Sequence, residues 1–332
     1  MTPSNPAAAA DPTDGDVYRG RVVVVTGGAG FIGSHLVEAL LRRGAAGVEV
    51  LDNLTSGRLD NLPEDRRVHV HALDLRTDDV RPLLEEQAPA AIFHLAGNAY
   101  IPDSVRDPAW DFEENILATI RLLEAVRHAA PTARLVFSSS AAVYGEGSPE
   151  PFREQDPTDP VSPYGVSKLA AERYVAVYAR LWQIRAGIAR IFPVYGPRLR
   201  KQVLYDLMCR IRADPHELFL HGDGTQVRDC NHVTNVVDAL LLIGDRGELR
   251  GEAYNVASGE LVTIAELARE TCTRMGVTPR LVFSGHVRPG DALKWSADIS
   301  RIASLGYSPR RRLAEGLSET IAWFRQDAEA PR

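Results

Sequence analysis

Cysteine is scarce in this chain of 332 residues, with only Cys209, Cys230 and Cys272 present. The three stand far apart and none forms a C-x-x-C pair, so neither a disulfide framework nor a paired-cysteine metal site is expected. Isolated thiols of this kind are typical of a reducing compartment. We therefore predict reduced, mostly buried thiols in a cytoplasmic protein that holds no metal.

Long apolar runs and an excess of basic charge are also missing. No stretch of about 18 apolar residues occurs, so no membrane span is expected. Lys and Arg number 38 against 44 Asp and Glu, and the net charge of −6 argues against a nucleic-acid or anionic-membrane partner. Residues 1–17 have neither the basic start nor the hydrophobic core of a signal peptide, and we predict a disordered extension there.

The length suggests two domains, or one large α/β domain with a substrate-binding addition. An apolar fraction of 45% and a charged fraction of 25% are ordinary for a soluble globular enzyme. We expect a dinucleotide-binding domain over 18–192. Residues 193–328 are expected to form mainly a smaller α/β substrate domain, with some segments returning to the first domain.

A glycine-rich stretch near the start of the first domain carries the strongest signal. Val22–Val25 form a short apolar run, as expected of a parallel strand buried on both faces. Residues 27–33 then place glycines as G-x-x-G-x-x-G, and residues 34–41 continue at helical period. This order predicts a tight turn whose backbone and following helix start bind a pyrophosphate.

An acidic residue ends the next predicted strand. Asp52 closes the strand of residues 48–52 and lies nineteen residues after Gly33, near the spacing expected for a carboxylate on an adenine-ribose diol. A carboxylate there would repel a 2′-phosphate, which favours NAD over NADP.

Strands and helices alternate through the rest of the first domain. Residues 68–73, 90–97 and 134–140 predict strands, and 77–86 and 110–128 predict helices. The alternation predicts a parallel, doubly wound Rossmann sheet with its chemistry at the carboxyl ends of the strands. Asp74 has two interpretations of equal weight, as a partner of the adenine amino group or as a cap of the helix over 77–86.

The second informative stretch is Ser162–Lys168, which opens a helix predicted over 164–181. Tyr164 and Lys168 are four residues apart and so share one helix face. A phenol with a pKa near about 10 is a poor base, but a nearby ammonium and a positive nicotinamide would lower that pKa. Ser140, at the end of a central strand, completes a candidate catalytic set.

Nine motifs occur along the chain in the order TGGAGFIGSH, DNLTSGR, FHLAG, FSSSAAVYG, SPYGVSK, VYGPR, GDGTQVRD, YNVASGE and RPGD. Together they resemble the extended short-chain dehydrogenase/reductase family, and within it the NAD-dependent nucleotide-sugar epimerases of the UDP-glucose 4-epimerase type. The resemblance runs from about Arg21 to Phe324. The resemblance implies a tightly held NAD, and a hydride that leaves the sugar C4 and returns to its other face.

The resemblance also implies roles for single residues. Tyr164 would be the base, Lys168 its ribose-binding partner, and Ser140 the hydroxyl that orients the substrate 4-OH. The implied NAD-binding residues are Gly27, Gly30, Phe31, Ile32, Gly33, Asp52, Asn53, Asp74, Leu75, Leu95, Ala96, Gly97, Asn115, Ser138, Tyr164 and Lys168. The implied substrate contacts are Ser140, Tyr164, Arg228, Arg288 and Asp291, with the two arginines on phosphates.

Ala141 and Ala142 favour one reaction among those of similar enzymes. Related 4,6-dehydratases carry an Asp-Glu pair at these two positions, and decarboxylases carry a Glu at the second. Alanine has no acid–base capacity, so the sequence favours simple C4 epimerisation. A 3,5-epimerase, a 4-ketoreductase and a non-catalytic NAD-binding protein are the alternatives.

Two departures from the pattern fall on the substrate side. Pro193 stands where most relatives have Asn, which removes an amide side chain and a backbone N–H. Cys230 replaces the usual aromatic residue and is interpreted as a packed thiol. The basic residues 198, 200 and 201 would either line the pocket or lie in a solvated loop. The helices at about 110–128 and 164–181 are expected to pair with their counterparts in a homodimer, as in similar enzymes.

Overall fold

A computed structural model of the chain describes residues 16–145, 150–286 and 294–329. Most of the predicted extension lies outside these ranges, but Asp16 and Val17 are ordered, in contrast to the prediction. Asp16 accepts a hydrogen bond from the backbone N–H of Tyr18, whose hydroxyl donates to the Leu241 carbonyl at 2.8 Å. No described helix is long and apolar enough to cross a membrane.

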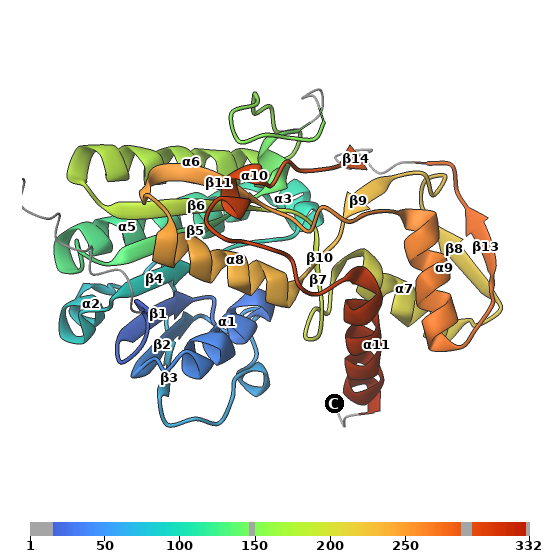
Figure 1. The fold of residues 1–332 in the computed structure, drawn as a ribbon, viewed down its shortest axis with the longest axis horizontal. Coiled ribbons are helices and arrows are strands. Elements are labelled where there is room, and N and C mark those ends of the chain that lie inside the picture. The colour runs from blue at the N-terminus through green and yellow to red at the C-terminus, as the bar shows by residue number, and fades with distance from the viewer. Residues whose placement is uncertain (1–15, 146–149, 287–293, 330–332) are drawn as a thin grey trace, which may run out of the picture.

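A seven-stranded parallel sheet organises the larger part of the molecule (Figure 1). Its strand order is β11-β6-β5-β4-β1-β2-β3. The bounds are β1 Val22–Thr26, β2 Gly47–Asp52, β3 Val68–Ala72, β4 Ala91–His94, β5 Arg134–Ser140, β6 Arg185–Ile191 and β11 Arg250–Val256. The order reverses between β1 and β4, and that is the point at which open α/β sheets bind ligands. The predicted Rossmann fold is confirmed.

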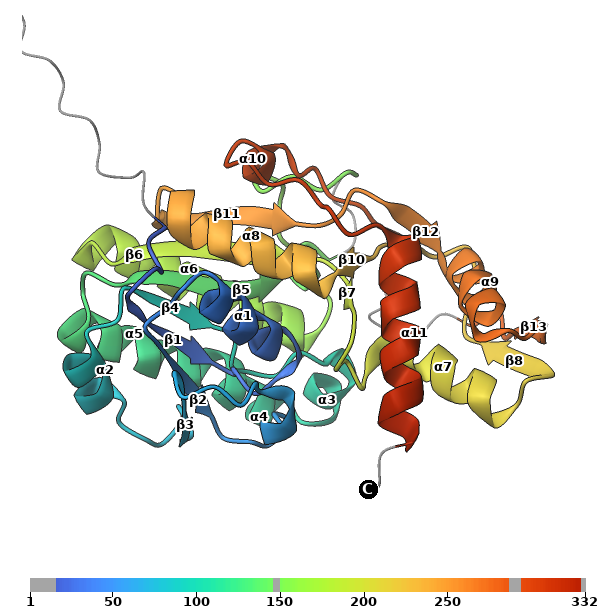
Figure 2. The same cartoon turned by 60° about the horizontal axis from the view of Figure 1, so that its bottom comes forward.

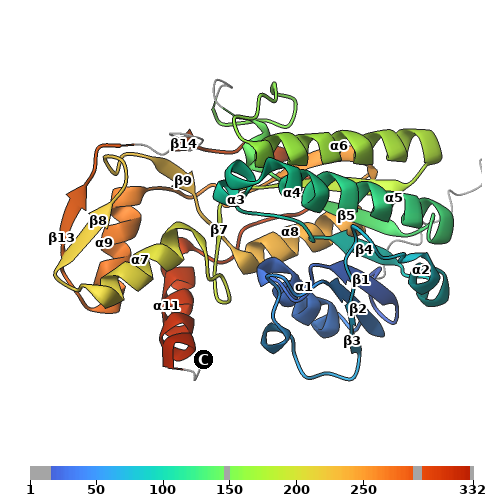
Figure 3. The same cartoon turned by 180° about the vertical axis from the view of Figure 1, so that it is seen from behind.

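Helices cover both faces of this sheet. α1 Phe31–Arg42 and α8 Val233–Arg246 lie side by side on one face (Figure 2). α2 Arg81–Gln87, α5 Ala118–Ala129 and α6 Pro163–Trp182 cover the other (Figure 3). Successive valines of β1 enter different cores, Val23 and Val25 on the α1 side and Val24 on the α5 side. The predicted burial of this strand on both faces is therefore confirmed.

Two predicted helices differ from those observed. The helix expected over 110–128 begins at Pro108 as α4 Pro108–Phe112, passes through a π-helical turn at Glu113–Leu117 and continues as α5. Asp107 starts it by accepting a hydrogen bond from the Trp110 N–H. The helix expected over 77–86 starts only at Arg81, where Pro82 supplies a fixed φ in the first turn. A further short helix, α3 Ile101–Arg106, was not predicted.

The smaller part of the molecule follows β6 along the chain. Its helices are α7 Gln202–Ala213, α9 Ile264–Met275 and α11 Leu313–Glu329, packed around a core of Leu207, Met208, Leu267 and Leu317. Its short strands pair as β7 Val194–Tyr195 with β10 Asn231–His232, β8 Glu217–Leu220 with β13 Arg280–Phe283, and β9 Val227–Asp229 with β12 Leu261–Thr263 and β14 Lys294–Trp295. The remaining short helices are η1 Leu59–Asn61, η3 Ala141–Val143 and α10 Ser300–Ala303.

Candidate active site

The glycine turn after β1 lets a helix start against two strand ends. Gly27 has φ +68°, and a Cβ on it would lie 2.7 Å from the Ala96 backbone nitrogen. A Cβ on Gly33 would lie 2.1 Å from the Gly27 carbonyl oxygen, so glycine is required where α1 crosses the turn. α1 begins at Phe31 without a side-chain cap, which leaves its first N–H groups and positive dipole end for an anion.

Asp52 lies over this turn, as its spacing predicted. One carboxylate oxygen accepts a hydrogen bond from the Ala29 N–H at 3.0 Å, and the other accepts one from the Leu54 N–H at 2.9 Å. Burial raises the pKa of this carboxyl, while the two N–H donors lower it. A Cβ on Gly57 would approach the carboxylate to 2.6 Å, so the loop after β2 also needs glycine beside it. The arrangement places an acidic acceptor directly beside the glycine turn.

Asp74 is already engaged by neighbouring side chains. Its carboxylate forms a bidentate pair with Arg76, with distances down to 2.6 Å, and accepts a hydrogen bond from Asn53 at 3.4 Å. The Arg76 guanidinium lowers the pKa of Asp74 to about 2. The capping interpretation is wrong because Val80, not Asp74, is the N-cap of α2. The adenine role of Asp74, with those of Asn53 and Leu75, stays a prediction.

A directed chain of hydrogen bonds supports the end of β4. The Thr119 hydroxyl donates to the Asn115 carbonyl at 2.6 Å, so it accepts from His94 Nε2 at 3.0 Å. His94 Nδ1 then accepts from the Thr26 hydroxyl at 2.7 Å, and that hydroxyl accepts the Ala96 N–H at 3.2 Å. The chain fixes the loop that carries Leu95, Ala96 and Gly97 against the glycine turn.

Ser140, Tyr164 and Lys168 meet at the carboxyl ends of β5 and β6. The Ser162 hydroxyl caps α6 by accepting the Gly165 N–H at 3.2 Å, and this sets the first turn that carries Tyr164. The Tyr164 hydroxyl hydrogen-bonds with Ser140. Lys168 Nζ donates to the Ser138 carbonyl at 3.2 Å and lies 6.0 Å from the Tyr164 ring centroid. The predicted catalytic set therefore assembles in one place.

The electrostatics of this set depart from expectation. Burial raises the pKa of Tyr164 to about 12, and Ser140 lowers it. Burial also lowers the pKa of Lys168 to about 8, against the opposite effects of Asp111 and Glu172. Lys168 alone therefore does not bring the phenol pKa below its usual value in this structure, and the predicted joint effect of Lys168 and a bound nicotinamide stays a prediction. The physical reason is that both side chains are buried, and burial penalises each charged form.

Several buried polar atoms near these residues have no hydrogen-bond partner among the described residues. They include Asn115 Oδ1, Asp111 Oδ2 and Ser139 Oγ. A Cβ on Gly97 would lie 2.6 Å from Asn115 Oδ1, so this amide oxygen lies directly beside the loop after β4. Buried polar groups without partners are rare in folded proteins unless a ligand or water satisfies them. With the glycine turn and Asp52, they fit a dinucleotide bound across the strand ends.

Two of the basic residues after β7, Arg198 and Lys201, contact the larger part of the molecule, while Arg200 pairs within the smaller part. Arg198 pairs with Glu38 of α1, and Arg200 pairs with Asp327 of α11 at 2.6 Å. Lys201 Nζ lies 5.7 Å from the Tyr100 ring centroid. Both arginines therefore form ion pairs with carboxylates. The sequence predicted either a lining of the pocket or a solvated loop for these residues, and neither alternative included such ion pairs.

The substrate-side predictions are only partly visible. Arg228 lies half-buried on β9 and donates to the Val227 carbonyl at 2.9 Å. Burial raises the pKa of Cys230 to about 12, as expected of an inert packed thiol. The Pro193 carbonyl accepts the Asn231 N–H at 2.8 Å. Arg288 and Asp291 lie outside the described residues.

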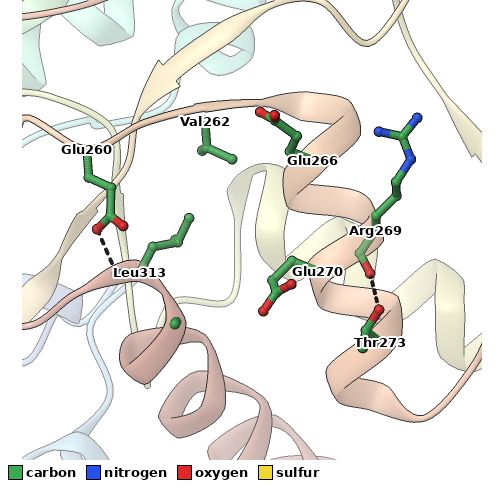
Figure 4. Close-up of a pocket in the computed structure, with 8 residues that line it drawn as sticks. Glu260, Val262, Glu266, Arg269, Glu270, Thr273 and Leu313 are labelled. Carbon is green, nitrogen blue, oxygen red and sulfur yellow. Dashed lines mark hydrogen bonds between the residues drawn. The ribbon is translucent and has the colours of Figure 1, made fainter.

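A hollow of about 390 Å³ lies away from this site, between one side of α9 and the start of α11 (Figure 4). None of the predicted site residues that the structure describes lines it. Its acidic side chains have partners of their own, since Glu260 accepts the Leu313 N–H and Glu266 forms a capping box with Thr263. Among the described residues, no group of three or more His, Cys, Asp or Glu side chains is placed to hold a metal ion. All three cysteines are free thiols.

A doubly wound sheet with a glycine turn and a Ser–Tyr–Lys set at its strand ends defines an enzyme of the short-chain dehydrogenase/reductase class. The sequence profile of the NAD dependent epimerase/dehydratase family matches residues 23–257. The chain therefore belongs to this family, is an enzyme, and uses NAD.

Individual relatives differ in their reactions. The UDP-glucose 4-epimerase of Mycolicibacterium smegmatis is 34% identical over 92% of this chain and 99% of its own. The dTDP-glucose 4,6-dehydratase of Streptomyces antibioticus is 32% identical over 92% of both chains. The solved structure of the Thermus thermophilus UDP-glucose 4-epimerase in complex with NAD is 36% identical, with a TM-score of 0.82 over 92% of this chain and 99% of its own. Epimerases and dehydratases are thus both close.

Some residues of the site were missed by sequence reasoning. Ser104 accepts the Tyr164 N–H at 3.1 Å, and Asp111 accepts hydrogen bonds from Asn98 and Asn115 at 2.7 and 2.9 Å. The i,i+4 spacing of Asp111 and Asn115 was a usable signal. The contacts of Ser104 and Asn98 depend on how the loop after β4 folds, which no local pattern shows.

Proposed function

We propose that the enzyme inverts C4 of a nucleoside-diphosphate sugar, of the UDP-glucose/galactose type, through a transient 4-keto sugar. The meeting of Ser140, Tyr164 and Lys168 supports an alcohol–ketone interconversion at one carbon. The near relatives named as UDP-glucose 4-epimerases support the substrate type.

The roles of the chain's residues follow from their placement. The ionised phenol of Tyr164 removes the proton of the sugar 4-hydroxyl, and Ser140, bonded to the same phenol, orients that hydroxyl. Lys168 supplies positive charge that favours the phenolate. When bound, NAD supplies the hydride acceptor and then the hydride donor at C4. The later return of the proton by Tyr164 restores the base for another turnover. Acid–base assistance of this kind typically contributes about 10²–10⁴-fold in rate.

Further residues would hold the cofactor and the substrate. The turn with Gly27, Gly30 and Gly33 would bind the pyrophosphate, and Asp52 would bind the adenine ribose. Arg228, Arg288 and Asp291 are the proposed contacts to the sugar nucleotide, because guanidinium groups match phosphate oxygens in pairs.

The observation that favours an epimerase over a dehydratase is the pair Ala141–Ala142. Both are buried directly after Ser140, with exposed fractions of 1% and 6%. The Ser140 hydroxyl accepts the Ala142 N–H at 3.2 Å, which starts η3 and fixes both alanines beside the catalytic serine. No acid or base is present at the two positions that supply one in similar dehydratases. C4 inversion needs no second base, so the alanines are compatible with it.

Product analysis tests this proposal. The NAD-loaded protein is incubated with UDP-, dTDP-, GDP- and CDP-sugars without added reductant, and the products are read by proton NMR. Inversion at C4 alone is expected, with a UDP-sugar turned over best. Stoichiometric NADH consumption in a parallel reaction supplied with NADH would indicate a 4-ketoreductase. Deuterium incorporated at C3 or C5 in a parallel reaction run in D₂O would indicate a 3,5-epimerase or dehydratase, and either result would overturn the proposal.

A further inference from the structure

Asp111 is a fully buried carboxylate that no predicted role includes. It lies on α4, which packs against α6, the helix that carries Tyr164 and Lys168 (Figure 3). Its Oδ1 accepts hydrogen bonds from the side-chain amides of Asn98 at 2.7 Å and Asn115 at 2.9 Å. Its Oδ2 is buried without a partner among the residues that the structure describes. The chain therefore keeps a half-satisfied carboxylate in its interior.

The charge of this carboxylate is not neutralised by an ion pair within the described part of the chain. Among residues 16–145, 150–286 and 294–329, no Lys, Arg or His lies within ion-pair distance of Asp111. The other carboxylate that acts on Lys168 is Glu172, and it is paired with Arg190 at 2.9 Å. An unpaired buried charge is costly, so its retention needs a compensating positive charge close by.

The titratable groups around Lys168 come from α4, α6, β6 and β4. α4 contributes Asp111, and α6 contributes Glu172, whose charge is offset by Arg190 of β6. His94 of β4 is neutral, because burial lowers its pKa to about 3. Asp111 lies on α4, which packs against α6, and its carboxylate raises the pKa of both Lys168 and Tyr164. It is the one uncompensated negative charge acting on this set among the described residues.

We propose that Asp111 is a positioning residue that keeps Lys168 protonated and favours the positively charged, oxidised cofactor over the reduced one. The inference rests on the cofactor placement in the proposed function. A buried negative charge attracts any positive charge added nearby, and oxidised NAD carries a positive nicotinamide that the reduced form lacks. Such a bias keeps the enzyme ready to accept hydride at the start of each turnover.

The two amides give Asp111 a second effect. Because Asn115 Nδ2 donates to Asp111, Asn115 Oδ1 faces Gly97 and the loop after β4. The carboxylate thus sets the orientation of an amide at the predicted NAD site. It acts through Lys168 and Asn115 and touches no reacting atom.

The test replaces Asp111 by Asn, which removes the charge at nearly constant volume. Protein is equilibrated with mixtures of NAD⁺ and NADH, and after release the bound NADH is read by absorbance at 340 nm and the total bound cofactor by absorbance at 260 nm. The preference for NAD⁺ over NADH is expected to fall by about tenfold, the change in an equilibrium constant that corresponds to a shift of one pKa unit. Asp111→Glu, which restores the charge, is expected to recover most of the preference.

Asp103→Asn is the matched control, because Asp103 lies on the neighbouring α3 and pairs with Arg106 at the surface. It is expected to leave the preference unchanged. The inference would be overturned if Asp111→Asn weakened the binding of NAD⁺ and of NADH equally. It would also be overturned if the Asn and Glu variants showed the same ratio of bound NAD⁺ to bound NADH. If thermal melting shows the Asn variant to be unfolded, Asp111→Ala carries the same expectation.

The readout needs no sugar. If the Asp111 variant changes the cofactor preference but the wild-type enzyme does not invert C4, the proposed function is rejected and the role of Asp111 stands. If the wild-type enzyme inverts C4 but the variant keeps the wild-type cofactor preference, only the role of Asp111 is rejected.

Discussion

At Tyr164, burial and hydrogen bonding act on the phenol in opposite directions. The ring is 8% exposed, and burial raises its pKa to about 12, while the Ser140 hydroxyl favours the phenolate. A base with that pKa is almost fully protonated near neutral pH. The proposed mechanism therefore requires the positive charges that gather around it, Lys168 and the oxidised cofactor, to lower this pKa in the loaded enzyme.

Tyr164→Phe removes the base and leaves its ring in place. We expect turnover to fall by at least about 10²–10⁴-fold, because the phenol is the proton acceptor, with NAD still bound. Product formation by NMR and the NAD content of the purified protein measure the two effects. Tyr174→Phe, at an exposed position of the same helix, is the control and should keep full activity. Retained activity in Tyr164→Phe would show that the base has been assigned wrongly.

Most of the site residues were accessible from local patterns. Tyr164, Lys168 and Ser140 are marked by spacing and by strand ends, and Asp52 by its distance from Gly33, so each was predicted before its contacts were known. Asp111 and Ser104 were missed because their importance comes from packing between α3, α4 and α6. The effect of burial on the Tyr164 pKa was missed for the same reason, since burial is a tertiary property.

Among the elements, β4 and its neighbours depend on a buried neutral histidine. His94 lies between Thr26 of β1 and Thr119 of α5. It accepts a hydrogen bond from the Thr26 hydroxyl and donates one to the Thr119 hydroxyl. Burial lowers its pKa to about 3, from a usual value near 6.5. Between these two pKa values the unfolded chain binds a proton at His94 and the folded chain does not. The contribution of neutral His94 to the free energy of unfolding is therefore complete above about pH 6.5 and is lost as the pH falls toward 3.

The measurable consequence is a pH-dependent free energy of unfolding. We expect this residue to contribute a loss that approaches about 1.4 kcal/mol per pH unit below pH 6. Denaturant unfolding at pH 7.5 and pH 5.5, for wild type and His94→Gln, isolates the contribution. The difference between the two proteins should shrink at the lower pH, while His128→Gln, at an exposed position, should change nothing. A pH-independent difference would contradict the neutral buried state.

The element predictions succeeded where local periodicity was decisive. β1, β5 and α6 match their predicted ranges within one or two residues, because apolar runs and caps set their ends. The helix expected over 77–86 begins late because Asp74, Thr77 and Asp78 form a turn of their own, with the Thr77 and Asp78 N–H groups donating to the Asp74 carbonyl. The π-helical turn before α5 has no pattern in the sequence that would have shown it.

For the whole molecule, the helices on the α6 side of the sheet carry exposed apolar residues. Tyr174 and Leu181 of α6 are 43% and 61% exposed, and Phe112 of the adjoining α4 is 50% exposed. Apolar residues gathered on one helical face commonly mark a contact surface. We propose that this face pairs with its counterpart in a homodimer.

The double variant Tyr174→Asp/Leu181→Asp tests this pairing. Light scattering during gel filtration should show a dimer for wild type and a monomer for the variant, with dimer affinity lowered by about a hundredfold or more because burying an unpaired carboxylate is costly. Leu261→Asp, at a position 46% exposed on β12, is the control. A monomeric wild type, or dissociation by the control as well, would contradict the proposal.

Isotope tracing tests the central claim of C4 inversion most directly. The NAD-loaded enzyme is given UDP-glucose deuterated at C4 in ordinary water, unlabelled UDP-glucose is given in parallel in D₂O, and both products are examined by NMR. We predict a C4-inverted sugar that keeps its deuterium at C4, since the hydride leaves and returns within one site, with no solvent hydrogen added at C3 or C5. Loss of the C4 deuterium to another position of the sugar, or solvent exchange at C5, would contradict C4 inversion.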